Sequence, residues 1–451
     1  MFKKVLIANR GEIALRINRA CHELGVSTVA IFSDVDRQSL HVRYADEAFC
    51  VGPGPVMRSY LNIPNIISAA LISGCDAIHP GYGFLAENAR FAEIAADHGL
   101  VFIGPKPAVI AAMGDKATAK RLMSEAGVPT TPGSGIVASV DEAKAVADEI
   151  GYPVLLKATA GGGGKGMRAV SSADELPTAF ATARAEAEAS FKDGRMYVEK
   201  LIVNPRHVEV QVLADEHGGA VHLGERDCSV QKPSHQKLIE EAPAPELDPA
   251  VRARLHEVAV SAVRAVGYTN AGTLEFLVSG DQTYFMEMNT RIQVEHPVTE
   301  LVYGVDLVKE QIRIASGEPL GFTQDDLQAH GHAIEVRVNA EDPQNGFAPA
   351  AGTLTNVVFP GGPGIRVDTH VYTGAVVPPF YDSMLAKIVA VGRTRESALL
   401  RMERALGETR IEGVKTTVDI CREIVADPEF RAGGIGVAWL PAFLARRTAA
   451  V

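Results

Sequence analysis

Cysteine is sparse in this chain, with five residues scattered along the sequence and no C-x-x-C pair. This spacing argues against a disulfide framework and against a zinc site built on paired thiolates. It is typical of a protein in a reducing compartment, so we expect a cytoplasmic location. The cysteines are Cys21, Cys50, Cys75, Cys228 and Cys421.

Long apolar runs and an excess of positive charge are also missing. The first apolar run, 5–8, stops at Asn9, too soon for the core of a signal peptide, and nothing approaches the roughly 20 residues of a membrane span. The formal net charge of −11 gives no support for a nucleic-acid partner, whose phosphates favour a basic face. We therefore expect no membrane and no nucleic acid as a partner, while local cationic clusters still allow a small anionic substrate.

The length of 451 residues exceeds a single ordinary core and predicts two or three domains. Residues 1–129 alternate short apolar runs with helical patterns, which is typical of βαβ units on a parallel sheet whose last buried strand would lie in the run 101–105. Residues 130–203 predict a small α+β module after a turn-rich boundary. Residues 204–451 contain strictly alternating strands, which predict an antiparallel sheet.

A glycine-rich loop, Gly161 to Gly166, lies between two predicted strands of the second module. A dinucleotide fingerprint needs a helix after its glycines, and a Walker A loop needs Ser or Thr after Lys165, where this chain has Gly166. The loop is therefore predicted to be a flap whose backbone N–H groups close over phosphates, with a merely mobile surface loop as the alternative. Cations in and beside the loop favour anion binding: Lys157, Lys165 and Arg168.

Residues 274–288 predict an antiparallel hairpin with a turn at 279–282. Glu275 lies on one arm, and Glu287 and Asn289 lie two residues apart on the other, so all three are expected on one face. Two carboxylates and an amide oxygen are hard donors suited to Mg²⁺ that also contacts nucleotide phosphates. A single glutamate on a sheet face is usually only solvated, but the combination favours a metal site.

The residues after the hairpin extend this pattern. If the chain stays extended past Asn289, the same alternation places Arg291, Gln293 and Glu295 beside the expected metal ligands. Such closely spaced charges gain little when they are simply exposed to water. They suit phosphoryl transfer, in which metals neutralise the leaving phosphates, a cation stabilises the intermediate and a carboxylate removes a proton.

Several long segments make the sequence resemble a known family: Ile7 to Ala14, His79 to Leu85, Met113 to Lys116, Gly161 to Gly166, Glu225 to Ser229, Glu287 to Thr299, and Asn339 to Pro343. With these segments, over nearly its whole length, the chain resembles the biotin carboxylase subunit of bacterial acetyl-CoA carboxylase, an ATP-grasp enzyme. The resemblance implies an ATP-grasp fold with a Rossmann-like N-terminal domain at 1–129, a small lid at 130–203 and a C-terminal antiparallel-sheet part at 204–451.

The resemblance implies ATP with Mg²⁺ or Mn²⁺, in two ions, and biotin as a carrier-bound substrate. Glu275, Glu287 and Asn289 match the magnesium ligands of the family, and they are the residues that the hairpin pattern selects. The residues expected at the ATP are Lys116, Lys157, Gly162, Gly163, Gly164, Gly166, Glu199, Lys200, His207, Glu209, Glu275 and Glu287.

The resemblance also implies the first chemical step. Glu295 would deprotonate bicarbonate, which then attacks the γ-phosphate of ATP to give carboxyphosphate. Lys237 and Arg291 would hold the bicarbonate and the intermediate, together with Gln293 and the backbone of Val294. Carboxyphosphate would break into CO₂ and phosphate, and the phosphate would take the ureido proton of biotin.

On the biotin side, Arg337 would stabilise the biotin enolate and Tyr82 would line the binding site. The alternatives are an ion pair of Arg337 with Glu335 and plain packing for Tyr82. His235 and Cys228 are assigned no role, because a histidine or a free thiol near a site is more often structural than catalytic.

One loop departs from the family pattern. Where the family reads Gln-Arg-Arg-His-Gln-Lys, this chain reads Gln-Lys-Pro-Ser-His-Gln-Lys at 231–237, which is one residue longer. Proline and serine replace arginine charge at Pro233 and Ser234. The reach of Lys237 to bicarbonate therefore depends on how this loop accommodates the additional residue.

No biotinylation site is found in the sequence, so the resemblance implies a separate biotin carboxyl carrier protein and separate carboxyltransferase subunits. It leaves the final acceptor open among acetyl-CoA, another acyl-CoA and pyruvate. Arg19, Glu23 and Arg366 match positions at which the family forms a homodimer. Two other functions are the alternatives: an ATP-grasp ligase that joins a carboxylate to an amine, and a regulatory subunit that binds nucleotide without catalysis.

Overall fold

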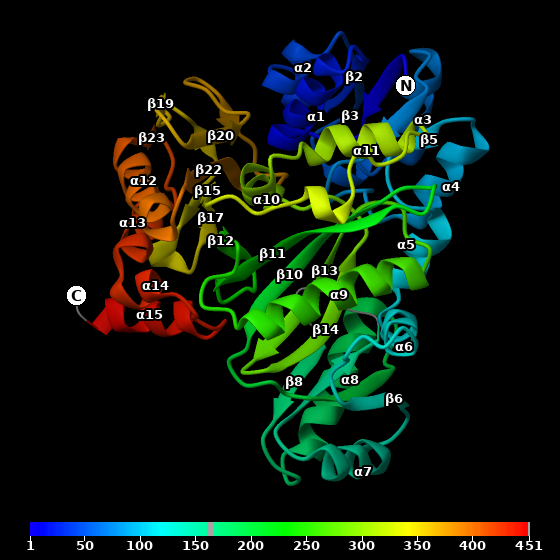
Figure 1. Cartoon of the computed structure of the whole chain (residues 1–451), viewed down its shortest axis with the longest axis vertical. Helices are drawn as coiled ribbons and strands as arrows, with labels where there is room; N and C mark the ends of the chain where they lie inside the picture. The colour runs from blue at the N-terminus through cyan, green and yellow to red at the C-terminus, as the bar shows by residue number, and fades with distance from the viewer. Residues whose placement is uncertain (160–165, 450–451) are drawn as a thin grey trace.

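The computed structural model describes residues 1–159 and 166–449 (Figure 1). The predicted phosphate-binding glycines Gly162, Gly163 and Gly164 lie outside the described residues. In Figure 1 the N-terminal unit is blue, the lid with β6, β8, α7 and α8 is at the bottom, and the C-terminal helices are orange and red. Within the described residues, we find no helix that is long and apolar enough to cross a membrane.

A five-stranded parallel sheet with the order β3-β2-β1-β4-β5 forms the N-terminal unit, which confirms the predicted parallel sheet. Its central strands are short apolar runs buried on both faces, as covering helices require. Val101 is 39% exposed, so the prediction that the last strand is buried is wrong; β5 lies at the sheet edge. The strands are β1 (Lys4–Ile7), β2 (Ser27–Ser33), β3 (Glu47–Gly52), β4 (Ala77–His79) and β5 (Val101–Phe102), and the helices are α1 (Gly11–Glu23), α2 (Leu40–Tyr44), α3 (Ile63–Ile72) and α4 (Ala89–Asp97).

The strand order reverses between β1 and β4, and the loops after these two strands are joined there. The Asn9 side chain donates through Nδ2 to the carbonyls of Pro80 at 2.7 Å and Tyr82 at 2.8 Å. Ligands of open parallel sheets bind outside the carboxyl ends of the strands at this kind of reversal. The edge that carries Glu12 and Tyr82 is therefore expected to face a binding cavity.

The lid is a four-stranded antiparallel sheet with the order β6-β9-β7-β8 and two helices on it. Ser139 caps the first helix by accepting from the N–H of Glu142, and alanines of both helices pack on the sheet. The predicted hairpin around the glycine loop is confirmed, because β7 pairs with β8. The elements are β6 (Gly133–Val137), β7 (Val154–Ala158), β8 (Met167–Val170), β9 (Met196–Lys200), α7 (Val140–Ile150) and α8 (Leu176–Phe191).

An eight-stranded sheet with the order β14-β13-β10-β11-β12-β15-β22-β20 forms the centre of the molecule. Its paired neighbours are antiparallel, and the hairpin predicted at 274–288 is present. The strands are β10 (Arg206–Ala214), β11 (Ala220–Gln231), β12 (Lys237–Ala242), β13 (Asn270–Ser279), β14 (Gln282–Asn289), β15 (His332–Asn339), β20 (Ile365–Thr369) and β22 (Met384–Gly392).

Helices cover this sheet over two apolar clusters. One cluster joins Val208, Val210 and Val212 of β10 to α5, α6 and α9, and the other joins β15 and β22 to α12 and α13. The helices of the whole central and C-terminal part are α5 (Pro107–Gly114), α6 (Lys116–Glu125), α9 (Pro249–Ala265), α10 (His296–Tyr303), α11 (Leu307–Ala315), α12 (Arg395–Glu408), α13 (Val418–Ala426), α14 (Pro428–Ala432) and α15 (Trp439–Ala449). Short pairs complete the C-terminal part: β16 (Glu341–Asp342) with β17 (Ala348–Pro349), β18 (Gly352–Thr353) with β21 (Val376–Val377), and β19 (Asn356–Val358) with β23 (Arg410–Glu412).

Replacement of Phe276 by alanine tests the core under the hairpin. Phe276 is fully buried on β13, and its ring meets that of Phe285 edge-on at a centroid distance of 6.2 Å. We expect Phe276→Ala to lower the free energy of unfolding by about 3–5 kcal/mol, because the lost contacts leave a cavity. Urea denaturation followed by circular dichroism measures this change. Leu400→Ala, at a position 54% exposed, is the control and should cost no more than about 0.5 kcal/mol; equal effects would contradict the prediction.

Candidate active site

One cavity of about 940 Å³ lies between the lid, the central sheet and the loops after β1 and β4. The size suits a nucleotide together with a second small substrate. The cavity brings together most of the residues predicted from the sequence, which come from all three units of the fold. The predicted residues that line it are Tyr82, Lys116, Lys157, Glu199, Lys200, His207, Lys237, Glu275, Glu287, Asn289, Arg291, Gln293, Val294, Glu295 and Arg337.

The hairpin places the two expected metal-binding carboxylates opposite each other, since Glu275 and Glu287 are register partners. Asn289 donates its amide to Glu275 Oε1 at 2.9 Å. Burial and the nearby Glu275 raise the pKa of Glu287, so negative charge at this point is only partly compensated. Burial also acts to raise the pKa of Glu275, but Lys237 and His207 outweigh it and hold that pKa well below its usual value. This oxygen-rich, acidic face fits a divalent cation.

Lys237 lies at the centre of three carboxylates. Its Nζ is 2.6 Å from Glu295 Oε1, 2.7 Å from Glu209 Oε2 and 3.0 Å from Glu275 Oε1. Burial by itself lowers the pKa of Lys237, but these three carboxylates raise it well above its usual value. The ammonium group is therefore charged and neutralises acids that would otherwise repel one another.

The longer loop before Lys237 closes as a tight turn. The Lys232 N–H donates to the Gln236 carbonyl at 2.9 Å, and the His235 N–H donates to the Lys232 carbonyl at 2.8 Å. His235 adopts a left-handed backbone conformation with φ of 61° and lines the cavity, although the sequence analysis assigned it no role. The additional residue is thus accommodated inside the turn, and Lys237 still reaches the cluster.

The chain does not stay extended past Asn289, so that part of the prediction is wrong: β14 ends there and a turn leads into α10, with Glu295 at its N-cap. The residues still converge, because their side chains bind back to the hairpin. Arg291 donates through Nη2 to Asn289 Oδ1 at 2.9 Å, and Gln293 donates through Nε2 to Glu275 Oε1 at 2.8 Å. The side chains thus converge in the cavity as predicted, although the backbone path differs from the predicted one.

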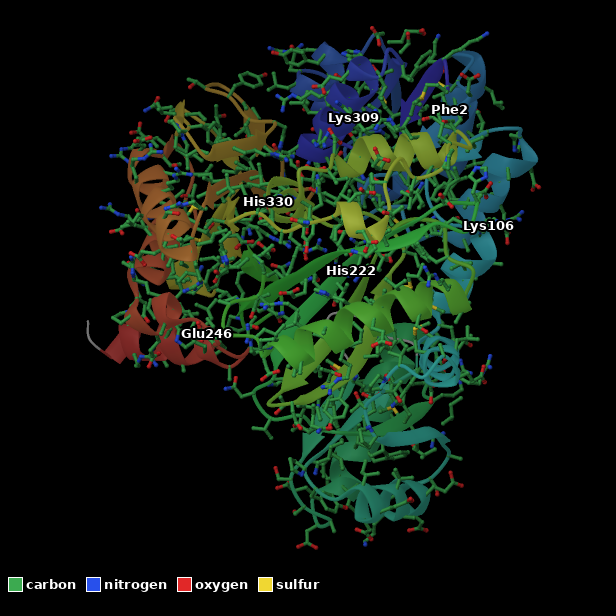
Figure 2. All side chains as sticks on the ribbon, in the orientation of Figure 1. Phe2, Lys106, His222, Glu246, Lys309 and His330 are labelled. Atoms are coloured by element: carbon green, nitrogen blue, oxygen red, sulfur yellow. The ribbon has the colours of Figure 1, made fainter. Side chains whose placement is uncertain are left out.

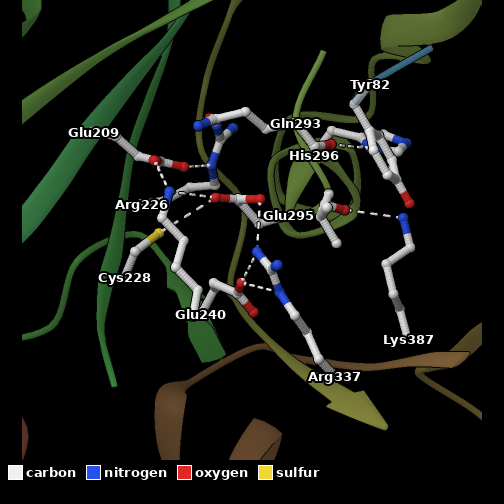
Figure 3. Close-up of polar contacts among 12 residues, drawn as sticks. Tyr82, Glu209, Arg226, Cys228, Glu240, Gln293, Glu295, His296, Arg337 and Lys387 are labelled. Atoms are coloured by element: carbon white, nitrogen blue, oxygen red, sulfur yellow. Dashed lines mark hydrogen bonds and ion pairs between the residues drawn. The ribbon is translucent and has the colours of Figure 1, made fainter. Parts of the chain in front are cut away.

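Arg226 is a fully buried arginine that links several residues of the site, and the sequence pattern did not indicate it. It donates to Glu209 Oε1 at 2.5 Å and to Gln293 Oε1 at 2.6 Å, two residues labelled beside it in Figure 3. It also donates to Gln211 Oε1 at 2.7 Å. Glu209 is fully buried between Arg226 and Lys237 and is not among the cavity-lining residues. The alternation of β10 indicated its face, but only the tertiary structure shows that this face is buried.

Arg337 lies between two carboxylates (Figure 3). It donates through Nε to Glu240 Oε1 at 2.6 Å and through Nη2 to Glu295 Oε2 at 3.0 Å, while Glu335 is not one of its hydrogen-bond partners. Burial acts to raise the pKa of Glu295, but Lys237, Arg337 and Arg226 outweigh it and hold that pKa far below its usual value. Glu295 is thus ionised at neutral pH.

Tyr82 belongs to a neighbouring polar cluster. Its hydroxyl donates to Glu12 Oε1, and Lys387 Nζ lies 3.2 Å from the same oxygen and 6.0 Å from the centre of the Tyr82 ring. Lys387 also donates to the Val294 carbonyl at 2.9 Å. The tyrosine therefore contacts the site through a hydrogen bond as well as through packing.

The opposite end of the cavity is cationic. Glu199 on β9 accepts from Lys157 at 2.8 Å and from Lys120 at 2.9 Å. Lys120 was not predicted, although it follows Lys116 by one helical turn on the same face of α6. The Lys200 ammonium instead donates to the carbonyls of Gly151 and Tyr152, both at 2.9 Å, so it stabilises the lid.

Gly166 is a further predicted position, and Cys228 is the cysteine near Glu295 to which the sequence assigned no role. Gly166 has φ of +72°, and a Cβ there would lie 2.9 Å from the Cβ of Ala158, so a larger residue would be strained. Cys228 is buried with its Sγ 3.9 Å from Glu295 Oε1, and burial raises the pKa of its thiol well above the usual value. An un-ionised thiol is a poor nucleophile, in keeping with the absence of a predicted role.

Comparison with known proteins gives consistent matches along the chain. Residues 1–110 match the family model for the biotin carboxylase N-terminal domain, residues 115–323 match the ATP binding domain of the carbamoyl-phosphate synthase L chain, and residues 335–442 match the biotin carboxylase C-terminal domain. The chain is 56% identical to the biotin carboxylase of Nostoc sp. over 441 residues, which covers 97% of this chain and 98% of that protein. It is 54% identical over 434 residues to one of the subunits of pyruvate carboxylase from Methanothermobacter thermautotrophicus, with 96% and 88% covered.

A solved structure shares the whole fold. The biotin carboxylase domain dimer of the Hydrogenobacter thermophilus 2-oxoglutarate carboxylase, in complex with MgADP, ADP and bicarbonate, aligns with a TM-score of 0.94. The two chains are 50% identical, and the alignment covers 98% of each. The predicted ATP-grasp architecture is thereby confirmed.

Replacement of Lys237 by methionine tests the central cation. We expect Lys237→Met to lower the free energy of unfolding by about 3–5 kcal/mol near neutral pH, because buried carboxylates lose their counter-ion. The pKa of Glu275 and that of Glu295 are depressed in the folded wild type, so their stabilising contribution exists above the unfolded pKa near 4 and is lost as pH falls. In the variant these pKa values rise. The difference in the free energy of unfolding between wild type and variant should therefore become smaller as the pH falls from 8 to about 5.

Thermal melting of both proteins over this pH range measures the effect. Lys106→Met is the control, since this side chain is 61% exposed (Figure 2). A deficit that grows with falling pH, or an equal deficit in the control, would contradict the prediction.

Proposed function

The chain belongs to the biotin carboxylase family, and we propose from this how the residues of its cavity divide the reaction. The chain catalyses the ATP-dependent carboxylation of biotin, as the first half of a carboxylase reaction. One observation carries the residue assignments: the expected base Glu295 and the cations Lys237 and Arg337 meet beside the acidic hairpin in the same cavity as Lys116 and Lys157.

We propose that Lys116 and Lys157 bind the phosphates of ATP. Lys157 is paired with Glu199, so phosphate would compete with that carboxylate for its ammonium group, while Lys120 continues to neutralise Glu199. The backbone of Glu199 and Lys200 on β9 would hold the adenine. Of the glycine loop, Gly166 anchors the start of β8, and Gly162, Gly163 and Gly164 are proposed to close over the phosphates.

Mg²⁺ fits the site formed by Glu275, Glu287 and Asn289, because their oxygens are hard donors. Burial and the nearby Glu275 raise the pKa of Glu287, so a bound cation would stabilise its charged form. A bound divalent cation neutralises the phosphate charge that develops as the γ-phosphoryl group leaves. His207 Nε2 lies 3.0 Å from Glu275 Oε2, and Lys237 holds the other oxygen of the same carboxylate. These contacts keep the ligand carboxylate oriented.

Glu295 is proposed to remove the proton of bicarbonate, held by Arg291, Lys237, Gln293 and the Val294 N–H. The low pKa of Glu295 makes it a weak base while Lys237 and Arg337 bind it. Bicarbonate would draw the Lys237 ammonium toward its own negative charge, and the pKa of Glu295 would rise toward the value needed for proton transfer. The anion thus increases the basicity of the residue that activates it.

Arg337 and Tyr82 are proposed to receive biotin. The guanidinium of Arg337 faces the cavity and is placed to stabilise an oxyanion on the ureido group. The biotin is proposed to arrive on a separate carrier protein, with separate carboxyltransferase subunits completing the reaction. The name of the Methanothermobacter relative, a subunit of pyruvate carboxylase, supports such a division.

A homodimer and a cytoplasmic location complete the proposal. The Hydrogenobacter relative is a dimer, which supports a dimer for this chain, and Arg19, Glu23 and Arg366 are proposed to lie at its interface. Glu23 lies 2.5 Å from Lys309 of α11, a residue marked in Figure 2, and Arg366 binds Glu300 at 2.6 Å. The free cysteines support the cytoplasm.

ATP hydrolysis with bicarbonate, measured with and without biotin, tests the function. We expect ADP release to require bicarbonate and to rise with free biotin or the biotinylated carrier. Glu295→Ala and Arg337→Ala should nearly abolish the biotin-dependent rate, by about 100-fold or more, while ADP binding measured by calorimetry persists. Wild-type rates in either variant would remove that residue from the mechanism, and ADP release indifferent to bicarbonate and biotin would refute the function.

The metal site predicts a separate response. Chelation of divalent ions by EDTA should abolish ATP hydrolysis, and excess Mg²⁺ should restore it. Glu287→Gln should raise the Mg²⁺ concentration for half-maximal rate by about tenfold or more, because one anionic ligand is lost. Glu93→Gln, at an exposed position on α4, is the control. An unchanged Mg²⁺ requirement in Glu287→Gln would exclude this carboxylate as a ligand.

A further inference from the structure

Two carboxyl groups lie buried beneath Arg337 without an assigned role. Glu240 on β12 and Glu335 on β15 are direct register partners in an antiparallel pair, and both are fully buried. Directly opposite residues of such a pair have Cβ atoms about 5 Å apart, where two like charges repel each other. Neither residue lines the cavity, so their effect on the reaction must pass through a neighbour.

That neighbour is Arg337, which follows Glu335 by two residues on the same face of β15. Glu240 Oε1 accepts from Arg337 Nε at 2.6 Å, and Figure 3 shows the guanidinium between Glu240 and Glu295. Among the described residues, Glu240 Oε2 and both oxygens of Glu335 have no hydrogen-bond partner. A buried carboxylate without partners is costly, so one member of the pair must be protonated.

Glu335 is the neutral member. Burial raises the pKa of Glu335 well above its usual value, and the facing Glu240 and Glu295 raise it further against the lowering effect of Lys387 and Arg337. Burial raises the pKa of Glu240 only to about 7, because the ion pair with Arg337 opposes it. Of the two carboxyl groups Glu240 therefore ionises first, and its 2.6 Å contact with Arg337 Nε places that charge at the guanidinium.

We propose that Glu240 is a positioning residue that holds Arg337 at the biotin site while Glu295 changes its protonation state, with Glu335 buried behind it. The inference rests on the proposed function, in which Glu295 and Arg337 act on bicarbonate and biotin.

The reason is a change of charge at Glu295 during turnover. When bicarbonate loses its proton, its O–H bond breaks and an O–H bond forms on a Glu295 oxygen, so that Glu295 becomes neutral. Its ion pair with Arg337 then weakens to an ordinary hydrogen bond. Glu240, which lies outside the cavity, keeps its charge and its 2.6 Å contact, so the guanidinium stays in place for the biotin enolate.

Glu240→Gln tests the inference, because it removes the charge and keeps the volume. The measurements are ATP hydrolysis with bicarbonate alone, ATP hydrolysis with added free biotin, resolved into kcat and KM for biotin, and thermal melting. We expect kcat/KM for biotin to fall by about tenfold to a hundredfold, and by at least about tenfold more than the rate without biotin, because a charge-assisted contact to Arg337 is lost.

Two matched variants separate charge from structure. Glu335→Gln replaces a neutral acid by a neutral amide and should keep kcat/KM for biotin within about twofold of wild type. Glu241→Gln removes an adjacent buried carboxylate that binds Arg395 at 2.7 Å and 3.0 Å on the other face of β12. It should lower the melting temperature but leave the biotin kinetics within about twofold, since it touches no residue of the site.

Three outcomes would overturn the inference. They are unchanged biotin kinetics in Glu240→Gln, an equal loss with and without biotin, and a loss in Glu335→Gln as large as that in Glu240→Gln. Each of them presupposes a biotin-dependent rate in the wild type. The absence of that rate would refute the proposed function instead, so the two failures are distinguishable.

Discussion

The Lys237 ammonium group is the interaction on which the site depends. It contacts carboxylates from β10, β13 and the turn before α10, namely Glu209, Glu275 and Glu295. Three acids that converge in a buried space would repel one another, and the shared cation offsets this repulsion; it also helps to hold the pKa values of Glu275 and Glu295 below the usual range. Arg226, which is fully buried, is a second shared cation: it donates to Glu209 and to Gln293. The acidic hairpin can face a nucleotide because these two cations neutralise the acids behind it.

The same principle applies at both ends of the cavity. At one end Glu199 neutralises Lys120 and Lys157, and at the other Glu240 and Glu295 neutralise Arg337. Three of the cations expected to meet a substrate, Lys157, Lys237 and Arg337, are thus paired with a carboxylate of the protein. An anionic substrate or intermediate then competes with an existing partner for the cation, so the cation stays paired when the substrate binds.

Much of the fold could be predicted from local patterns. Buried runs such as 5–8 predicted the parallel sheet, and alternation at 207–212 and 274–288 predicted the antiparallel strands, because these periods depend only on the geometry of the strand. The prediction failed for Val101, which lies at a sheet edge, and for the path after Asn289, where the chain turns into α10. Whether a strand is an edge, and where a loop turns, depends on neighbours far away in the sequence.

By itself the sequence determined which residue types the site contains, since Glu275, Glu287, Asn289, Arg291 and Glu295 lie within two short segments whose spacing and family resemblance indicate their chemistry. It did not show which of them are partners. The link of Arg337 to Glu240, of Lys157 to Glu199 and of Lys237 to three acids joins strands that are distant in the chain. Only the tertiary structure decides such pairings, because burial removes the water that would screen these charges and makes each depend on the nearest opposite charge.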